Sequence, residues 1–304
     1  MDATSNRLIA KDFEHTTSGT SWASPPRKLV WGIVVAAGFL LVVHSAARRP
    51  ADPGEPLLLH AREHLLHTPR ATLRVGTFNI HGGKGTDGKR DLQRTADCLR
   101  DLDFVALQEV RGSVVGLPKI QAGVLGRELQ MAWIFAPTQR AKWHERFGNA
   151  VLTRLPLTSF LRIPLVSTGY HRPRNAVFVN LLHNAHTVHV LAAHVDNLRD
   201  REQQLRAVAD LFLALEEPAL LLGDLNADAS HPEIRRLLAT PGVVDAFCSA
   251  PGASRADRHI DWILVRGLRV LSAESFDNGA SDHPRLRAEL EIAPGAKKLV
   301  LNPH

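Results

Sequence analysis

The chain has 304 residues, of which 44% are hydrophobic and 22% charged, so it is long and apolar enough for a globular fold and is unlike a disordered protein. The formal net charge is +6, but little of it lies in residues 72–293, so net charge gives no argument for nucleic acid as a partner. The two cysteines, Cys98 and Cys248, are too few for a disulfide or zinc framework.

The N-terminal part of the chain is predicted to contain one membrane anchor. Residues 1–26 have the composition of a disordered tail, and the apolar run Leu29–Val43 that follows is flanked on both sides by Arg and Lys. We expect a transmembrane or signal-anchor helix over residues 27–47, with the following domain outside the cytoplasm. The alternative is a signal peptide cleaved near Ala47, which would give a secreted protein. The proline-containing segment 48–71 is predicted to be a linker.

From residue 72 onward the hydrophobic pattern alternates between strands and helices, and it ends at residue 293, before a C-terminal tail over 294–304. Helical spacing predicts helices over 91–102, 200–215 and 232–238. Short apolar runs bounded by turn residues predict strands over 73–80, 104–110, 150–153, 176–182, 188–193, 220–222, 260–265, 269–275 and 285–292. So many strands with few helices indicate packed sheets covered by helices, rather than a doubly wound parallel sheet.

The strand predicted at Leu220–Leu222 runs into Gly223-Asp224-Leu225-Asn226. Asp224 and Asn226 are two residues apart, so in an extended chain both side chains would point to the same side. A carboxylate beside a carboxamide can orient a water molecule and contact a phosphate oxygen. Taken alone, the motif is equally consistent with an Asx-rich turn that closes a strand.

The same kind of ending recurs along the chain. Six separate segments carry polar residues suited to phosphate chemistry at or beside a predicted strand: Asn79, Glu109, His194 with Asp196, Asp224 with Asn226, Asp261, and Asp282 with His283. Each has a plain structural explanation by itself. Six such segments spread over two hundred residues are hard to explain as turns, so the pattern indicates one composite site.

These segments contain the motifs T-F-N, L-Q-E-V, A-A-H-V-D, G-D-L-N-A, H-I-D-W-I and S-D-H-P in this order. In this the chain resembles the endonuclease/exonuclease/phosphatase superfamily, which includes deoxyribonuclease I, abasic-site nucleases, neutral sphingomyelinases and inositol-polyphosphate phosphatases. The resemblance covers residues 72–293. It implies a four-layer α/β sandwich, in which two mixed β-sheets pack face to face, helices flank them, and the site lies at one rim.

The resemblance also implies roles for individual residues. Glu109 is expected to be the main ligand of a divalent metal ion, with Asn79 and Asp282 near it. Mg²⁺ suits such oxygen donors, Mn²⁺ is the alternative, and the number of ions stays open. Asp224 and Asn226 are expected to orient the attacking water and the scissile phosphate.

Two histidine–carboxylate pairs are expected from the same resemblance. His283 is similar to the catalytic histidine of the family and is expected to pair with Asp261, which would favour the imidazolium form. His194 is expected to lie on the opposite side of the phosphate. Its expected partner is Glu145, which resembles the corresponding glutamate of deoxyribonuclease-type members.

Three residues are expected to contact substrate. Arg174 matches a phosphate-contacting arginine, with an ordinary solvated loop arginine as the alternative. Arg111 and Trp143 stand where deoxyribonuclease I places groups that enter the minor groove. His81 departs from the abasic-site nucleases, which have an acidic metal ligand at this position, and so argues against that subgroup.

The sequence therefore predicts a metal-dependent hydrolase of phosphodiester bonds, nuclease-like, acting by in-line attack of an activated water. One alternative is a membrane-tethered phosphodiesterase or phosphatase that acts on lipid headgroups, which suits the predicted anchor better. Another is a catalytically inactive binding protein on the same fold. The expected partners are a nucleic acid or lipid-headgroup substrate and a membrane, with a monomeric catalytic domain.

Overall fold

The computed structural model describes residues 27–47, 58–60, 71–112, 120–139, 146–168, 173–250, 252 and 259–293. The chain divides into two compact units, Met1–His44 and Ser45–His304. The predicted tails over 1–26 and 294–304 lie outside the described residues, as does most of the predicted linker.

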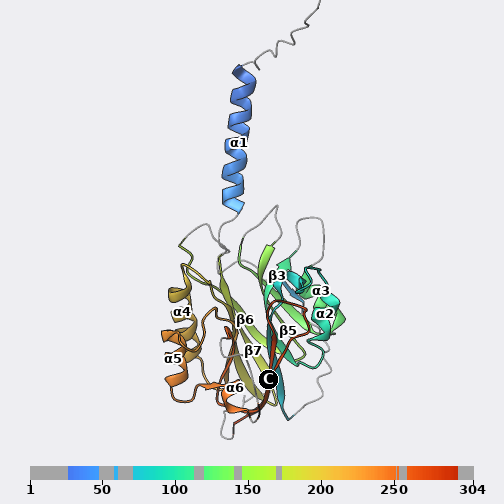
Figure 1. The fold of residues 1–304 in the computed structure, drawn as a ribbon, viewed down its shortest axis with the longest axis vertical. Coiled ribbons are helices and arrows are strands. Elements are labelled where there is room, and N and C mark those ends of the chain that lie inside the picture. The colour runs from blue at the N-terminus through green and yellow to red at the C-terminus, as the bar shows by residue number, and fades with distance from the viewer. Residues whose placement is uncertain are drawn as a thin grey trace, which may run out of the picture. The chain divides into compact units, whose positions relative to one another are not determined.

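The first unit is built on helix α1 (Arg27–Ala47), drawn in blue in Figure 1. Large apolar side chains are exposed along it, among them Trp31 and Phe39, which are 68% and 69% exposed. Within the described part of the chain, no helix has both the length and the hydropathy needed to cross a membrane. The anchor predicted over residues 27–47 is therefore unconfirmed.

The second unit contains two mixed β-sheets. The first sheet has seven strands in the order β1-β4-β5-β3-β2-β13-β12. Their bounds are β1 (Leu58–His60), β4 (Ala132–Pro137), β5 (Arg146–Thr153), β3 (Phe104–Gly112), β2 (Leu73–Asn79), β13 (Arg285–Ile292) and β12 (Leu268–Phe276). β2 and β3 are parallel, and the other neighbouring pairs are antiparallel. The short strand β1 lies inside the segment predicted as a linker.

The second sheet has six strands in the order β10-β11-β9-β8-β7-β6. Their bounds are β10 (Val244–Asp245), β11 (Asp261–Arg266), β9 (Ala219–Asp224), β8 (His186–His194), β7 (Asn175–His183) and β6 (Leu157–Pro164). β8 and β9 are parallel, and the other neighbouring pairs are antiparallel.

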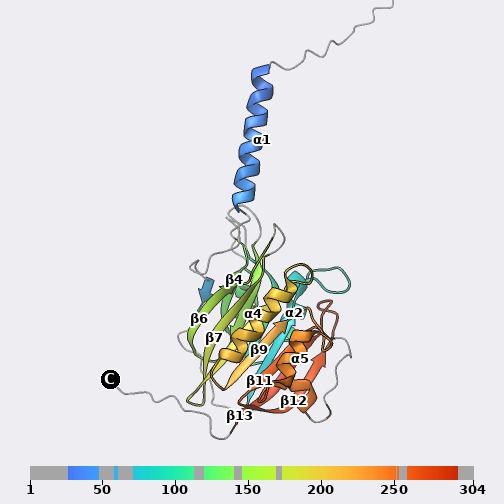
Figure 2. The same ribbon diagram turned by 90° about the vertical axis from the view of Figure 1, so that its left-hand side faces the viewer.

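The helices cover the outer faces of the two sheets, as Figures 1 and 2 show. On the seven-stranded sheet lie α2 (Leu92–Asp97) and α3 (Gln121–Glu128), packed through a buried cluster that includes Leu99 and Leu125. On the six-stranded sheet lie α4 (Arg201–Ala214) and α5 (Pro232–Ala239), packed through Val208 and Leu237. Two short helices, η1 (His81–Gly83) and α6 (Ala246–Ser249), complete the described elements. The predicted α/β sandwich is confirmed.

The apolar residues at the start of strand β9 follow one another without the alternation of a half-buried strand. All six of its residues are buried. Leu220 and Leu222 belong to the core between the two sheets, whereas Leu221 belongs to the cluster under α4 and α5. A strand buried on both faces needs apolar residues at every position. Each such leucine stabilises the fold by about 1.5–3 kcal/mol through burial.

The helix predicted over 91–102 is shorter in the structure than the helical spacing of its apolar residues suggests. Asp91 caps it by accepting hydrogen bonds from the backbone N–H groups of Gln93 and Arg94, but the helix ends at Asp97. Beyond that point the bonds from Leu99 N–H to Ala96 O and from Leu102 N–H to Leu99 O span only three residues. The buried spacing of the apolar residues thus continues through tight turns rather than through an α-helix.

Candidate active site

Strand β9 brings Asp224 to the edge where β8 also ends. His194 and Asp224 are direct partners in the parallel register of β8 and β9. The preceding residue must be glycine, because a Cβ atom on Gly223 would lie 1.9 Å from the carbonyl oxygen of Ala193, and its φ of +146° is one that side chains rarely adopt. The close contact of the two backbones therefore fixes the position of the Asp224 carboxylate, which is 2% exposed.

One oxygen of Asp224 lies at the centre of the site. Asn79 Nδ2, at the end of β2 in the other sheet, donates a hydrogen bond to Asp224 Oδ2 at 3.0 Å. His194 Nε2 lies 3.5 Å from the same oxygen, and His283 Nε2 lies 3.8 Å from it. Four of the six predicted segments thus meet at one carboxylate oxygen.

Asn226 does not stand beside Asp224 in the predicted way. Its φ is +49°, so the chain has left the extended conformation on which the prediction of a shared side depended. Its backbone N–H donates to Asp224 Oδ1 at 3.0 Å, and its Nδ2 donates to the carbonyl of Val195 at 2.9 Å. Asn226 therefore holds the carboxylate mainly through its backbone.

The predicted pair of His283 and Asp261 is present. His283 Nδ1 lies 2.8 Å from Asp261 Oδ2, and Asp261 is the direct partner of Asp224 in the antiparallel register of β9 and β11. Burial opposes the charged imidazole, but the hydrogen bond and charge of Asp261, together with the charge of Asp224, outweigh it and raise the pKa of His283 to about 9.

The same surroundings act on Asp224. Burial, together with the neighbouring charge of Asp261, raises the pKa of the Asp224 carboxyl to about 7, against the opposing effect of the His283 charge. We refer to Asp224, Asp261, His194 and His283 as the acid–histidine cluster. At neutral pH its His283 carries a proton, and its Asp224 is close to the pH at which it exchanges one.

Strand pairing and one hydrogen bond link Asn79 to the sequence neighbours of the other two predicted metal ligands, Glu109 and Asp282. Asn79 pairs with Gln108, the neighbour of Glu109, in the parallel register of β2 and β3. Ser281 Oγ, the neighbour of Asp282, lies 2.6 Å from the carbonyl oxygen of Asn79. We refer to Asn79, Glu109 and Asp282 as the predicted metal set.

The donors of the predicted metal set fit a hard divalent cation. Glu109 lies in the bulge of β3 between Leu107 and Val110, with a φ of +58° that is strained for a glutamate. The residue is half-buried, and no hydrogen bond or ion pair joins its carboxylate to any residue in the described ranges. The Asn79 Oδ1 accepts the N–H of His81, which orients it. Carboxylate and amide oxygens are the ligands that Mg²⁺ prefers.

A second arrangement of acidic and histidine side chains must be compared with that set. Among the described residues, Asp224, Asp261 and His283 are the group whose possible ligand atoms lie within 4.8 Å of one another. His283 Nδ1 lies at hydrogen-bonding distance from Asp261, and the raised pKa of His283 favours the imidazolium, a cation that would repel a metal ion. We therefore interpret this group as a proton-holding network and not as a metal site.

The structure describes two of the predicted substrate residues, Arg174 and Arg111. Glu145 and Trp143 lie outside the described residues. Arg174 is buried, and its Nη1 lies 3.1 Å from His194 Nδ1. The side chain of Arg111 lies against Gly82, where an added Cβ atom would be 2.4 Å from its Nε. Arg111 thus borders the turn that carries His81.

Sequence reasoning missed two contacts at this edge. His81 Nδ1 lies 3.3 Å from Asp282 Oδ1, so it touches a member of the predicted metal set. Asn149 and Asn175 are both buried and join β5 to β7 through a bond from Asn149 Nδ2 to Asn175 Oδ1 at 2.9 Å. The signal for the second contact was an asparagine directly before an apolar run in each of two strands, Asn149 before Ala150–Leu152 and Asn175 before Ala176–Val179.

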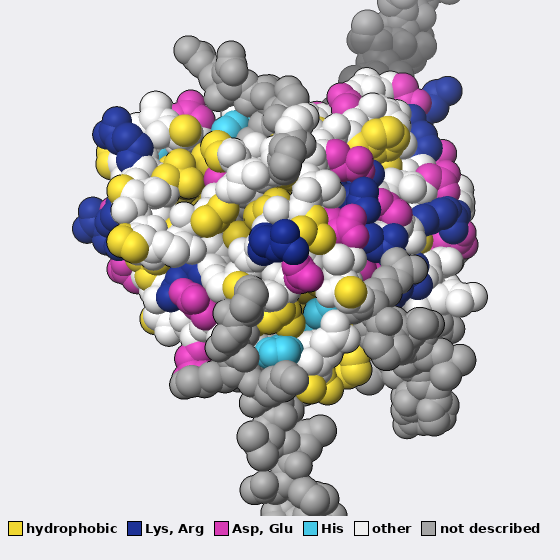
Figure 3. Space-filling view, turned by 90° about the horizontal axis from the view of Figure 1, so that it is seen from below, with side chains coloured by type: hydrophobic (Ala, Val, Ile, Leu, Met, Phe, Trp, Pro, Cys, Tyr) yellow, Lys and Arg dark blue, Asp and Glu magenta, His cyan; other side chains and the backbone are white. Residues whose placement is uncertain are grey.

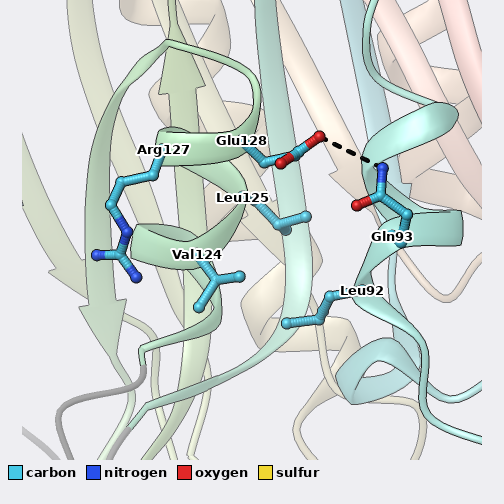
Figure 4. Close-up of a pocket in the computed structure, with 6 residues that line it drawn as sticks. All are labelled: Leu92, Gln93, Val124, Leu125, Arg127 and Glu128. Carbon is cyan, nitrogen blue, oxygen red and sulfur yellow. Dashed lines mark hydrogen bonds between the residues drawn. The ribbon is translucent and has the colours of Figure 1, made fainter.

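A separate pocket lies between α2 and α3 (Figure 4). Its walls are Leu92, Gln93, Val124, Leu125, Arg127 and Glu128. Glu128 accepts a hydrogen bond from Gln93 across it at 3.3 Å. None of these six residues belongs to the predicted site, so the pocket is not where the polar strand ends meet.

Comparison with known proteins gives one family. The model described as "Endonuclease/Exonuclease/phosphatase family" matches residues 76–283. A search of curated protein sequences finds no match.

Solved structures agree in fold. An endonuclease/exonuclease/phosphatase from Beutenbergia cavernae DSM 12333 is 23% identical with a TM-score of 0.60, over 74% of this chain and 72% of that one. A mannosyl-6-phosphatase from Bacteroides thetaiotaomicron VPI-5482 is 16% identical with a TM-score of 0.56, over 72% of this chain and 100% of that one. A humanized D. rerio TDP2 is 17% identical with a TM-score of 0.55, over 73% of this chain and 100% of that one.

Proposed function

The chain belongs to the endonuclease/exonuclease/phosphatase family, and we propose on this basis that it hydrolyses phosphodiester bonds with the help of a divalent metal ion. The observation that carries the proposal is the convergence on Asp224 Oδ2 of Asn79 from one sheet and of two imidazoles, His194 and His283. A structural carboxylate needs one cationic partner. A carboxylate surrounded by an amide and two imidazoles, beside a set of oxygen donors, suits activation of water next to a phosphate.

Asp224 is the proposed acceptor of the proton of the attacking water. A pKa of about 7 is favourable for a general base that works at neutral pH, because the group is then both ionised and basic enough. The Asn79 amide and the Asn226 backbone N–H hold its two oxygens in place. Attack in line with the leaving group requires this fixed position more than a covalent intermediate.

His283 is the proposed stabiliser of the charge that develops on the phosphate. Its hydrogen bond to Asp261 fixes Nδ1–H, so Nε2 points toward the reaction. Because its pKa is raised to about 9, it is an imidazolium at neutral pH. A preorganised cation at the developing charge contributes about 10²–10³ in rate.

Asn79, Glu109 and Asp282 would hold the metal ion, for which Mg²⁺ is proposed and Mn²⁺ is the alternative. When bound, such an ion polarises the phosphate and offsets its negative charge. The carboxylate of half-buried Glu109, which has no cationic partner among the described residues, supports this assignment.

A nuclease-like substrate is proposed first, because Arg111, a residue expected to contact the substrate, lies against the turn that carries His81. The face seen in Figure 3 has cationic and anionic side chains interspersed, so the described atoms there form no continuous basic surface. Nucleic acid would therefore be held at the rim of the site and not along that face. A lipid headgroup is the alternative substrate and agrees with an N-terminal anchor.

The test is hydrolysis by the full chain with Mg²⁺ and with chelator, offered supercoiled DNA in parallel with sphingomyelin and phosphoinositide vesicles. Nicking of DNA that stops with chelator and in His283→Ala supports the nuclease proposal. Lipid cleavage without nicking supports the alternative. If neither the DNA nor either lipid is hydrolysed, with or without Mg²⁺, the proposal is wrong and the result favours a binding protein on this fold.

Membrane attachment through α1, with the catalytic unit outside the cytoplasm, is also part of the proposal. Its support is the apolar sequence of the helix and the basic residues on both sides of it. Alkaline carbonate extraction of membranes tests it. A protein that is released by carbonate is not anchored by this helix.

A further inference from the structure

We propose that the short hairpin Lys84–Arg90, beside the candidate active site, binds a phosphate group of a nucleic-acid strand other than the phosphate that is cleaved. Lys84 and Arg90 are the two cations that make this contact. The link to hydrolysis rests on the proposed function, whereas the binding itself is measurable without any cleavage.

Backbone hydrogen bonds close the hairpin. Lys84 and Arg90 are direct partners in an antiparallel β-bridge. Inside this bridge, the N–H of Gly85 donates to the carbonyl of Lys89 at 2.9 Å, and the N–H of Gly88 donates to the carbonyl of Gly85 at 2.9 Å. Gly88 has a φ of +77°, a conformation that glycine adopts without steric cost. The segment is therefore a defined turn with its two ends held together.

The hairpin is fixed next to the predicted metal set. The N–H of Lys84 donates to the carbonyl of His81 at 3.2 Å, and the His81 ring contacts Asp282. On the other side, the N–H of Thr86 donates at 3.0 Å to the carbonyl of Gly279, which lies three residues before Asp282. Both contacts join the hairpin to segments that carry residues of the site, so the hairpin borders the site.

The charges of the bridge are arranged unfavourably for the free protein. Partners in an antiparallel bridge have their side chains on the same face, with Cβ atoms about 4.5–5.5 Å apart, and like charges in such a pair are destabilising. Lys84 is half-buried and Arg90 is exposed. Neither side chain forms a hydrogen bond or ion pair with any residue in the described ranges. Two neighbouring cations without a carboxylate partner are suited to hold an anion.

The acidic residues nearest to the bridge are already paired. Asp87, the one acid in the sequence of the hairpin, accepts two hydrogen bonds from the Arg94 guanidinium, both at 3.1 Å. Asp91, which follows the hairpin, caps α2 and lies 3.5 Å from Arg94 Nε. Both carboxylates are therefore neutralised by Arg94, and the charges of Lys84 and Arg90 stay available for a ligand.

The anion that suits this place is a phosphate of a nucleic-acid strand. Lys and Arg bind phosphate well, and the proposed function supplies a phosphate-containing substrate. A third cation, Arg111, lies against Gly82, two residues before Lys84. Cations at successive positions along one turn suit a backbone that carries phosphates at regular intervals, whereas a lipid headgroup offers its phosphates at a single place. The arrangement therefore favours nucleic acid.

The experiment measures binding of a fluorescein-labelled DNA duplex by fluorescence anisotropy. It uses the full chain in a mild non-ionic detergent with EDTA, so that metal-dependent cleavage does not occur, at about 50–200 mM salt. The affinity of the wild-type protein should fall as salt rises. Lys84→Gln and Arg90→Gln should each weaken binding by up to about tenfold and lower the salt slope by about 1, as expected for one lost phosphate contact.

Arg235→Gln is the matched control. Arg235 is an exposed arginine of α5, on the outer face of the other sheet, and its substitution removes the same charge. Affinity and salt slope should stay at the wild-type values. Lys84→Glu is a second variant, which places opposite charges in the bridge. Its thermal midpoint should rise by about 1 °C while its DNA binding falls below that of Lys84→Gln.

The inference is overturned if Lys84→Gln and Arg90→Gln have the affinity and salt slope of Arg235→Gln, or if the wild-type protein does not bind the duplex. Lost cleavage of phosphoinositide vesicles in these variants, with unchanged DNA binding, would also overturn it and would assign the cations to a lipid headgroup. The expected binding pattern in a protein that hydrolyses no DNA with Mg²⁺ would refute the proposed nuclease function and leave the binding inference standing.

Discussion

The acid–histidine cluster and the predicted metal set lie side by side but are built differently. In the cluster, Asp224 and Asp261 are buried and each is bonded to or in contact with other members of the cluster. In the metal set, the Asp282 side chain is 58% exposed and Glu109 has no partner among the described residues. The two halves of the site therefore make different demands on the fold.

The difference reflects what each half has to supply. A group that moves or holds a proton must have its tautomer fixed in advance, and hydrogen bonds do this. A ligand for a metal ion must keep lone pairs available, so bonds to the protein would compete with its function. One half is complete in the protein alone, and the other would be completed by the proposed ion.

Asp224 belongs to the first half and touches the second through Asn79, so its removal should have the largest effect. We expect Asp224→Asn to lower kcat by about 10³–10⁴-fold at saturating metal, because the proton acceptor is lost while the shape is kept. Steady-state kinetics measures this, with circular dichroism as the check on folding. An activity within tenfold of wild type would remove Asp224 from its proposed role.

His283→Ala tests the first half alone. Loss of the imidazolium should lower kcat by about 10²–10³-fold, and adding metal should not restore it. The matched control is His186→Ala. His186 is a partly exposed histidine outside the site, and its Nδ1 lies 2.8 Å from the carbonyl oxygen of Asn184. Recovery of His283→Ala at high metal concentration would contradict the separation of the two halves.

Glu109→Gln tests the second half. It should weaken metal binding by about 10–100-fold or more, measured by titration calorimetry with Mn²⁺, because a charged oxygen donor is replaced by a neutral one. Much of its activity should return at high metal concentration, unlike that of His283→Ala. Unchanged metal affinity would mean that the ion is held elsewhere.

The smallest effect concerns stability and pH. The pKa of His283 is raised from 6.5 to about 9, so its contribution to the free energy of unfolding is fully present below about pH 6.5 and is lost as pH rises through about 9. The urea midpoint of the metal-free wild type should therefore fall over this range more than that of His283→Gln. Parallel pH profiles for the two proteins would contradict the raised pKa.

Much of the fold could be predicted from the sequence, because burial in this chain follows hydrophobic pattern. The strands that carry polar ends, such as β2, β3 and β9, were found through apolar runs buried on both faces. Strand β6 was missed because Phe160 and its neighbours are exposed, so no alternation marks it. Helix α3 was missed because two glycines in Gln121–Glu128 weaken the helical signal.

The site was predicted as a set of residues, and its geometry was less accessible. The pair of His283 with Asp261 was expected from the family resemblance, and the structure contains it. The left-handed turn at Asn226 could not, because φ is set by contacts such as the bond to Val195 O. The expected pair of His194 with Glu145 stays a prediction, because Glu145 lies outside the described residues. The contact of His194 with Arg174 was not expected, because it arises through strand pairing and not through sequence spacing.

The position of β13 has a consequence for biosynthesis. This last strand of the unit lies between β2, one of the first to be made, and β12. Ser281, just before it, contacts Asn79 across 202 residues of sequence. Until β13 has been synthesised, β2 lacks its neighbour on that side and His283 has not met Asp261. The residues of the site can therefore come together only after the chain has been made as far as β13, whatever part of the scaffold has already folded.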